Sequence, residues 1–114
     1  MSKGWIPAAG DLIKLDFDPQ SGHEQAGYRP GLVVSPASYN GKLGLALICP
    51  ITSQVKGYPF EVLIPSTSKL TGVVLSDQIK CLDWKSRKAK FVEAAPATVL
   101  EKVRQHLKLI LEVK

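Results

Sequence analysis

The sequence predicts a mainly β domain that ends in one amphipathic helix, built as a small, strongly bent sheet or barrel. Short apolar or alternating segments follow one another up to about residue 93, with turn residues between them. Beyond that point the apolar spacing changes to one helical face, formed by Val99, Leu100, Val103, Leu107, Ile110 and Leu111. Strands in series with a helix packed on them are typical of bent sheets and barrels.

The length supports a single domain, residues 1–114. A chain of this size buries only a modest core unless it also buries surface in an oligomer. No internal repeat or low-complexity segment divides the chain. We therefore expect one domain, with a dimer as the natural way to bury more surface.

The first strand is expected over residues 12–18, because apolar and polar side chains alternate from Ile13 onward. Residues 19–28 show no apolar periodicity and contain proline, serine and glycine. A loop this long in so small a domain is usually functional or disordered. A second strand is expected over residues 31–35.

The Asn40-Gly41 pair predicts a tight hairpin turn, followed by a strand over residues 43–51. Residues 45–49 are apolar on both faces, so this strand is expected at the centre of the sheet, ending at Pro50. Further short strands are expected over residues 60–64, 72–75, 78–82 and, at an edge, 89–93.

The tail should form a helix that begins near Pro96, since proline is tolerated in a first helical turn. Lys102, Arg104 and Lys108 place positive charge towards its end, where the helix dipole favours it. The apolar face from Val99 to Leu111 is predicted to be core.

Both cysteines, Cys49 and Cys81, lie in apolar runs without a CxxC spacing. Two buried free thiols are predicted, with a disulfide as the less favoured alternative. The N-terminal residues lack an apolar signal region, and the longest apolar stretch, residues 45–49, is far too short to cross a bilayer. We therefore expect a soluble, cytoplasmic protein.

The net charge of +5 is unevenly distributed. Residues 1–28 carry two lysines against four carboxylates, which leaves +7 on residues 29–114. Residues 80–90 alone carry five cationic side chains against Asp83. Such a balance favours a polyanionic partner, either nucleic acid or an acidic protein segment, although many basic surfaces are only solvated.

Arg29 stands where a polar loop meets the apolar run of residues 32–34. A strand end fixes the arginine backbone and leaves its guanidinium free to reach an anion, and the planar fork suits a phosphate better than a lysine would. The alternative is an ordinary loop arginine in a surface ion pair.

Four segments together carry a specific resemblance: residues 10–13 (GDLI), 24–31 (EQAGYRPG), 50–62 (PITSQVKGYPFEV) and 75–80 (LSDQIK). In order and spacing they resemble the MazF/PemK (Kid) family of toxin endoribonucleases, from about Trp5 to Leu111. The resemblance implies an SH3-like barrel, a homodimer, and sequence-specific, metal-independent cleavage of single-stranded RNA. The expected ends are a 2′,3′-cyclic phosphate and a 5′-hydroxyl.

The resemblance also implies roles for residues and a bacterial, cytoplasmic toxin. Arg29 matches the catalytic arginine of the family, and Thr52 matches the active-site threonine that holds the scissile phosphate. Asp77 and Gln78 match a second RNA-contacting region. In the Kid branch an arginine stands two residues before that aspartate, whereas this chain has Leu75, which indicates the MazF branch.

The 2′-hydroxyl of RNA is a built-in nucleophile, so no metal or other cofactor is expected, and the carboxylates are too scattered for a convincing metal cluster. Glu24 is the preferred general base, and His23 competes because its ordinary pKa is better placed. His23, Gln25 and Lys56 are further expected RNA contacts, with Lys80 drawing in the backbone.

Four aromatic side chains near these segments are candidates for stacking on bases, with packing in the core or a dimer interface as the alternative for each: Phe17, Tyr28, Tyr58 and Trp84. Phe17 is counted among the expected RNA contacts.

The implied partner, besides RNA, is a cognate MazE-like antitoxin that lays an acidic, otherwise disordered tail along the basic groove. A second hypothesis is a non-catalytic toxin resembling CcdB, which binds and poisons DNA gyrase. CcdB proteins end in Trp-Gly-Ile and this chain ends in Leu-Glu-Val-Lys, which argues against that reading. A plain RNA-binding barrel is a third, weaker hypothesis.

Overall fold

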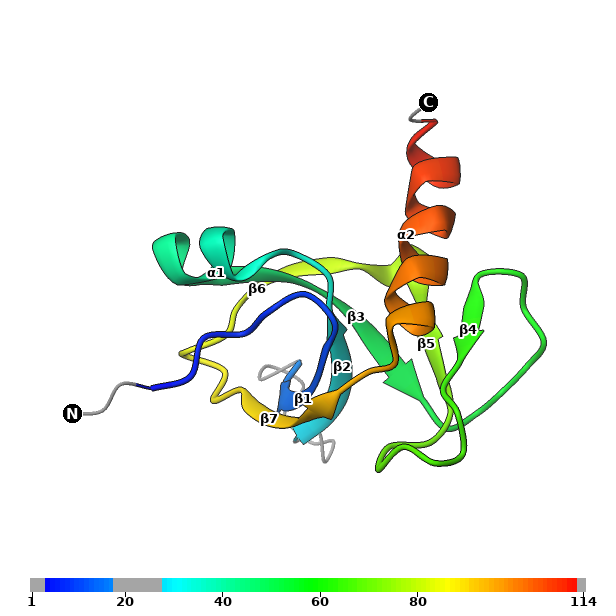
Figure 1. The fold of residues 1–114 in the computed structure, drawn as a ribbon, viewed down its shortest axis with the longest axis horizontal. Coiled ribbons are helices and arrows are strands. Elements are labelled where there is room, and N and C mark those ends of the chain that lie inside the picture. The colour runs from blue at the N-terminus through cyan, green and yellow to red at the C-terminus, as the bar shows by residue number, and fades with distance from the viewer. Residues whose placement is uncertain (1–3, 18–27, 113–114) are drawn as a thin grey trace.

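The computed structural model describes residues 4–17 and 28–112, which form one antiparallel sheet and two helices (Figure 1). The elements in order are β1 (Asp11–Asp16), β2 (Tyr28–Val33), α1 (Ala37–Leu43), β3 (Leu45–Thr52), β4 (Glu61–Leu63), β5 (Val73–Leu75), the 3₁₀ turn η1 (Ser76–Gln78), β6 (Lys80–Asp83), β7 (Lys90–Ala94) and α2 (Ala97–Leu111). The prediction of a mainly β domain with a C-terminal helix is confirmed.

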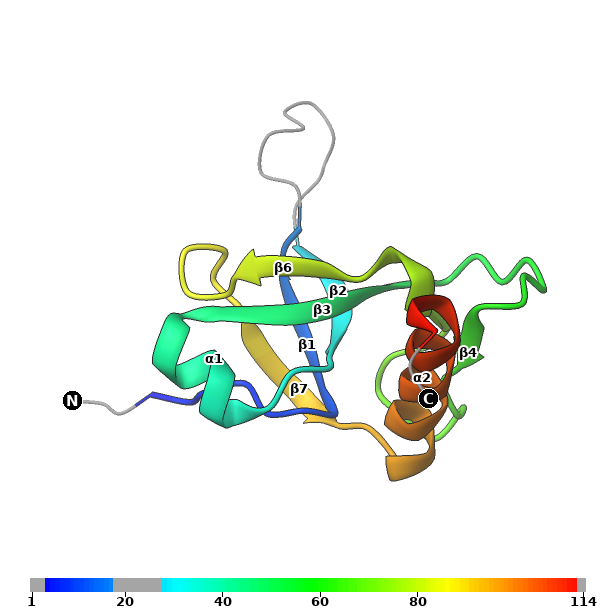
Figure 2. The same ribbon diagram turned by 90° about the horizontal axis from the view of Figure 1, so that it is seen from above.

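Strand β3 organises the sheet. The order is β4-β5-β3-β2-β1-β7, and β6 pairs with the first half of β3, so β3 contacts three other strands. It runs from α1 at one end of the molecule towards α2 and β4 at the other (Figure 2). The central position predicted for this strand is confirmed, as is the edge position of β7.

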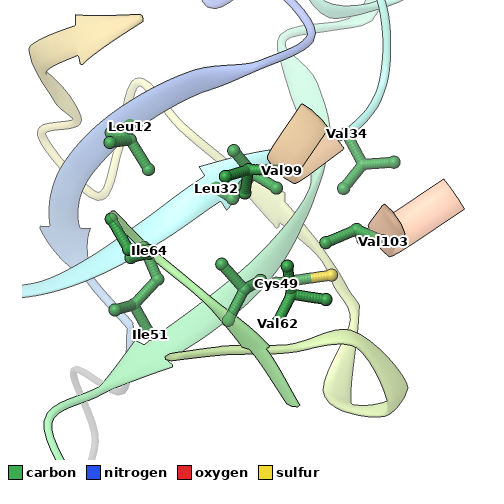
Figure 3. Close-up of a cluster of buried hydrophobic side chains, with 10 residues drawn as sticks. Leu12, Leu32, Val34, Cys49, Ile51, Val62, Ile64, Val99 and Val103 are labelled. Atoms are coloured by element: carbon green, nitrogen blue, oxygen red, sulfur yellow. The ribbon is translucent and has the colours of Figure 1, made fainter. Parts of the chain in front are cut away.

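Two hydrophobic clusters lie on opposite faces of the bent sheet. The first lies between the sheet and α2 and includes Leu12, Leu32, Cys49 and Val103 (Figure 3). The second gathers these buried side chains: Ile13, Leu15, Phe17, Val33, Ala46, Ile48, Leu82 and Trp84. Because successive strand residues point to opposite faces, β1 and β2 each supply both clusters. The chain therefore divides its small core in two.

The predicted Asn40-Gly41 hairpin is wrong, because residues 37–43 form helix α1. The Asn40 side chain is fully buried; it donates to the backbone carbonyls of Pro7 at 2.8 Å and Ser35 at 2.9 Å, and accepts from the Ser35 hydroxyl at 2.5 Å. A buried amide that satisfies three partners outweighs the local turn preference of Asn-Gly. Gly44, at φ +72, ends the helix instead.

Helix α2 is confirmed, but its apolar face is only partly core. Val99 and Val103 are buried, whereas Leu109, Ile110 and Leu111 are 68%, 41% and 68% exposed. The last turns of α2 project beyond the sheet (Figure 1), and within residues 4–17 and 28–112 these three side chains stay exposed. Within the described residues, neither helix is long and apolar enough to cross a membrane.

Both cysteines are free thiols, as predicted, but only Cys49 is buried. Burial raises the pKa of the Cys49 thiol to about 12. Cys81 is exposed on β6, where the prediction of a buried thiol is wrong, because its side chain faces outward from that strand. The Tyr39 hydroxyl lies 3.9 Å from the Cys81 sulfur, and this contact raises the pKa of Tyr39.

Candidate functional site

Arg29 lies near the start of β2 and Thr52 at the end of β3, and because the two strands are antiparallel neighbours these ends lie side by side. Arg29 lies inside β2, which begins at Tyr28, three residues earlier than the predicted strand. In the β2–β3 ladder Gly31 pairs with Pro50 and Leu32 with Cys49. Continued by two residues, this register sets Arg29 opposite Thr52. Two segments separated by some twenty residues of sequence therefore meet at one point of the surface.

Arg29 and Thr52 stand between two adjoining hollows, and both residues line each hollow. The first hollow has a volume of about 530 Å³ and is also lined by Lys56, Gln78 and Glu61, among others. The second, about 400 Å³, adds Lys14, Tyr28 and Lys69 to the shared pair. We call the first hollow the loop-side lobe and the second the lysine lobe.

The two lobes differ in charge. The loop-side lobe carries Arg29 and Lys56 against the Glu61 carboxylate. The lysine lobe carries Lys14, Arg29 and Lys69, and no carboxylate lines it among the residues that the structure describes. Together they form a groove with a surplus of positive charge, suited to an extended polyanion whose phosphates follow one another along it.

The Thr52 hydroxyl accepts one hydrogen bond, and this bond does not use its own O–H hydrogen. Its oxygen accepts the backbone N–H of Gln54 at 3.1 Å. Since a hydroxyl has one donor and two acceptor sites, the O–H hydrogen remains available to a group in the groove. Strand β3 fixes the backbone, and the contact to Gln54 restrains the side chain.

Gly72 lets the segment of residues 70–72, which forms one wall of the lysine lobe, come close to Thr52. It has φ +115, and a Cβ placed there would lie 2.1 Å from the Thr52 carbonyl oxygen. Only glycine accommodates both this conformation and this closeness. The approach brings Leu70 and Thr71 into the lysine lobe.

The rim of the loop-side lobe is formed by Tyr58 and η1. The Tyr58 hydroxyl donates to the Asp77 carboxylate at 2.8 Å, and this hydrogen bond raises the pKa of Tyr58. Gln78, next along η1, lines the lobe with its amide exposed. An exposed amide offers donor and acceptor groups together, which is what recognition of a base edge needs.

Of the residues predicted for the site, four line the groove: Arg29, Thr52, Lys56 and Gln78. Asp77 is at its rim through Tyr58. Glu24, His23 and Gln25 lie outside the described residues. The general base therefore stays a prediction.

The aromatic candidates divide by burial. Phe17 is 7% exposed and packs in the second core cluster, and the Lys80 ammonium lies 6.0 Å from the centre of its ring. The packing alternative for this ring therefore fits the structure better than stacking on a base, and its assignment as an RNA contact stays a prediction. Trp84 is equally buried and donates its indole N–H to the Asn40 carbonyl at 3.1 Å. Tyr28 and Tyr58 are 40% and 47% exposed and line the groove.

Sequence reasoning missed Lys14, Glu61, Lys69 and Gly72. The signal was weak, because each lies in a segment whose place at the groove depends on strand pairing. Glu61 alone could have been suspected from the sequence, because it lies in the segment of residues 50–62 that resembles the MazF/PemK family. Within the described ranges, residues 4–17 and 28–112, no three His, Cys, Asp or Glu side chains group in a way that could hold a metal ion.

The comparisons with known proteins agree with this geometry. The model of the PemK-like, MazF-like toxins of type II toxin-antitoxin systems matches residues 8–111, nearly the whole chain. This chain belongs to that family. Both segments that carry Arg29 and Thr52 lie inside the match.

Two relatives from Escherichia coli support the same family assignment. The endoribonuclease toxin MazF of Escherichia coli K12 is 51% identical over 89 residues, which cover 78% of this chain and 79% of that protein. The endoribonuclease PemK of Escherichia coli is 36% identical, over 90% of this chain and 80% of its own length. Both relatives belong with the MazF/PemK toxins, and the CcdB-like alternative is not favoured.

The fold is shared with crystal structures from Deinococcus radiodurans. A MazF structure superposes with a TM-score of 0.88 at 52% identity, covering 96% of this chain and all of that one. A MazE-MazF structure superposes with a TM-score of 0.92 at 51% identity, covering 97% and 100%. The expected MazF/PemK fold is confirmed.

Proposed function

We propose that this chain is the toxin of a toxin-antitoxin system and cuts single-stranded RNA at a short sequence, without a metal ion. The observation that carries the proposal is the placement of Arg29 and Thr52 between two lobes of one positively charged groove. Each of the two relatives described above is an endoribonuclease. A strand of RNA lying in both lobes has one phosphate at the arginine and threonine.

The chemistry follows from that phosphate. The 2′-hydroxyl oxygen attacks the adjacent phosphorus, the bond to the 5′-oxygen breaks, and the products are a 2′,3′-cyclic phosphate and a 5′-hydroxyl. Negative charge grows on the non-bridging oxygens in the transition state, and the Arg29 guanidinium and the Thr52 O–H are placed to stabilise it. No metal is needed to generate the nucleophile, because the substrate contains it.

The proton of the 2′-hydroxyl needs a base, and the leaving 5′-oxygen needs an acid. We assign the base to Glu24, five residues before Arg29 in the sequence, with His23 as the competing residue. A glutamate at its ordinary pKa is a weak base near neutral pH, so this assignment requires a raised pKa in the complex. A pH profile of the two variants Glu24→Gln and His23→Gln separates the two assignments.

RNA binding is assigned to the groove walls. Lys56 in the loop-side lobe and Lys14 and Lys69 in the lysine lobe attract phosphates, while Gln78 reads a base edge. We include Gln25 among the RNA contacts, and Asp77 acts from the rim. A single strand is the substrate because its bases can be turned towards the groove, which a duplex does not allow.

The proposed protein partners are a second copy of this chain and an antitoxin with an acidic tail. The exposed Leu109, Ile110 and Leu111 at the end of α2 are apolar surface that a homodimer would cover. The surplus of +7 on residues 29–114 favours an acidic tail in the groove. The Deinococcus radiodurans relative is found with MazE. We place this activity in the bacterial cytoplasm.

The test is incubation with a long single-stranded RNA in EDTA, with cut ends mapped by primer extension and assayed for cyclic phosphate. Arg29→Ala and Thr52→Ala are compared with Arg104→Ala, an exposed arginine of α2 outside the groove. We expect cuts at one short motif that disappear in the first two variants only. Intact RNA with a folded wild-type protein would contradict the proposal and direct attention to gyrase.

A further inference from the structure

The loop between β3 and β4, residues 53–60, supplies three side chains to the loop-side lobe: Gln54, Lys56 and Tyr58. The loop has no strand ladder of its own, and all but its last residue are exposed. Loops of this kind move unless side chains tie them down. What ties this loop down decides where those three groove residues stand.

Glu61 provides a double tether. Its carboxylate accepts the backbone N–H of Lys56 at 3.1 Å with one oxygen and that of Gly57 at 3.0 Å with the other. Its own backbone N–H donates to the Tyr58 carbonyl at 3.1 Å. Glu61 opens β4 and pairs with Leu75 of β5, so the sheet fixes the position from which it holds the loop.

The loop backbone is shaped for this contact. Gly57 adopts φ +76, in the left-handed region, and a Cβ there would meet nothing within 4 Å. Glycine is therefore required at this position by the backbone angle rather than by space. The turn at Gly57 aims two successive N–H groups at one carboxylate, an arrangement that favours a negative charge.

We propose that Glu61 is a positioning residue that sets which RNA sequence this chain cuts, by holding the loop of residues 53–60 against the substrate. The inference rests on the ribonuclease activity proposed above. Both Glu61 oxygens are engaged by the loop, so the carboxylate serves the loop rather than the reacting phosphate. The backbones of Arg29 and Thr52 are held by pairing with Leu15 and Val73, and the Glu61 carboxylate takes part in neither pairing.

The tether also fits the loop-side lobe electrostatically. Among the described residues that line the lobe, Glu61 is the one carboxylate, and it stands beside Arg29 and Lys56. An unpaired carboxylate there would repel an RNA phosphate. With two N–H donors on it, its charge is spread over the loop backbone, and Lys56, which supplies one of those N–H groups, lines the same lobe.

The test compares Glu61→Gln with Glu101→Gln, the same change at an exposed position of α2 that lines neither lobe. Glutamine keeps one acceptor oxygen but turns its NH₂ towards an N–H donor, so one tether is lost. We expect amide hydrogen exchange of residues 54–58 to quicken by roughly tenfold to a hundredfold, because hydrogen bonds to a charged acceptor are lost. Glu101→Gln should leave it unchanged.

The activity readout is the set of cut sites on a long RNA, with KM and kcat on the preferred site. We expect Glu61→Gln to cut at additional, related sequences and to raise KM by about tenfold while kcat stays within about threefold. A second variant, Gly57→Ala, strains the same turn without changing charge and should relax the cut sites in the same way. Thermal unfolding of each variant confirms that it folds.

The outcomes separate the two proposals. Wild-type protein that leaves RNA intact overturns the ribonuclease activity, and the inference with it. Wild-type cleavage, with Glu61→Gln cutting the same sites at the same KM, overturns the inference alone. A fall in kcat at unchanged KM and unchanged sites also overturns it, because that pattern places Glu61 in the chemistry instead.

Discussion

Removing the Arg29 guanidinium should abolish most of the RNA cleavage without unfolding the protein. Arg29 is exposed, and its backbone is fixed by pairing with Leu15 of β1. Truncation to alanine therefore leaves no cavity and no buried partner unpaired. The loss is confined to the charge that meets the phosphate.

The magnitude follows from that geometry. Losing one preorganised donor to a developing oxyanion costs about 3 kcal/mol, or a factor of 10²–10³ in kcat. KM should change little, because the charge being stabilised grows mainly in the transition state. Arg29→Lys keeps the charge and loses the fork, so we expect a smaller loss, about tenfold.

Thr52 provides an internal check, since it should hold the same phosphate. Thr52→Val removes the hydroxyl and also frees the Gln54 N–H, whereas Thr52→Ser keeps both. We expect a loss of roughly 10- to 100-fold for valine and nearly full activity for serine. Single-turnover cleavage of a fluorescent RNA measures each variant.

The double variant decides whether the two residues act together. If Arg29 and Thr52 contact one phosphate, the combined loss should be clearly smaller than the product of the single losses. Fully multiplicative losses, or an Arg29→Ala protein that keeps a third of its activity, would refute the placement of both residues at the scissile phosphate.

Three further predictions concern the scaffold. At pH 8, iodoacetamide should label the exposed Cys81 much faster than Cys49, because Cys49 is buried and burial raises the pKa of its thiol to about 12, which leaves little thiolate; mass spectrometry of the labelled native protein checks this, and the difference should largely disappear in urea. Asn40→Ala should lower the free energy of unfolding by roughly 3 kcal/mol or more, measured by urea denaturation, since three buried hydrogen bonds are lost together. Gly72→Ala should destabilise by roughly 2–4 kcal/mol and reduce cleavage, because the new Cβ displaces the Thr52 carbonyl; unchanged stability of either variant would contradict the contacts described.

Most strands could be predicted from sequence because their apolar pattern is local. The alternation from Ile13 and the apolar run of residues 45–49 each carry their own signal. Asn40 could not be predicted, since its partners are the distant Pro7 and the nearby Ser35, and only the folded chain brings all three together. A strong local turn signal was therefore misleading.

The end of α2 shows what apolar periodicity does not predict, which is how much of the apolar face becomes buried. Periodicity identified the apolar face correctly, but it does not say how far the sheet extends beneath it. Val103 is fully buried, and two turns later Leu111 is 68% exposed. An apolar stripe predicts that something covers it, and the described residues of this chain do not cover the last turns.

The residues that line the groove also differ in how far the local sequence predicts them. Arg29 and Thr52 could be predicted to line the groove because each stands in a recognisable segment, while Lys14 and Lys69 were missed because nothing in their own neighbourhoods sets them apart. Their place in the groove comes from β1 pairing beside β2 and from the approach of the Gly72 segment to β3.

This division has a mechanistic consequence. The Arg29 backbone pairs with Leu15 of β1 and the Thr52 backbone pairs with Val73 of β5, so the sheet fixes the backbones of both residues. Lys56 and Gly57 belong to a loop that the Glu61 carboxylate tethers through their backbone N–H groups. Substitution of Arg29 or Thr52 should therefore change whether RNA is cut, and substitution of Glu61 should change where. A loop variant that lost activity at every site while keeping the native ladder would show that chemistry and recognition are not separable in this way.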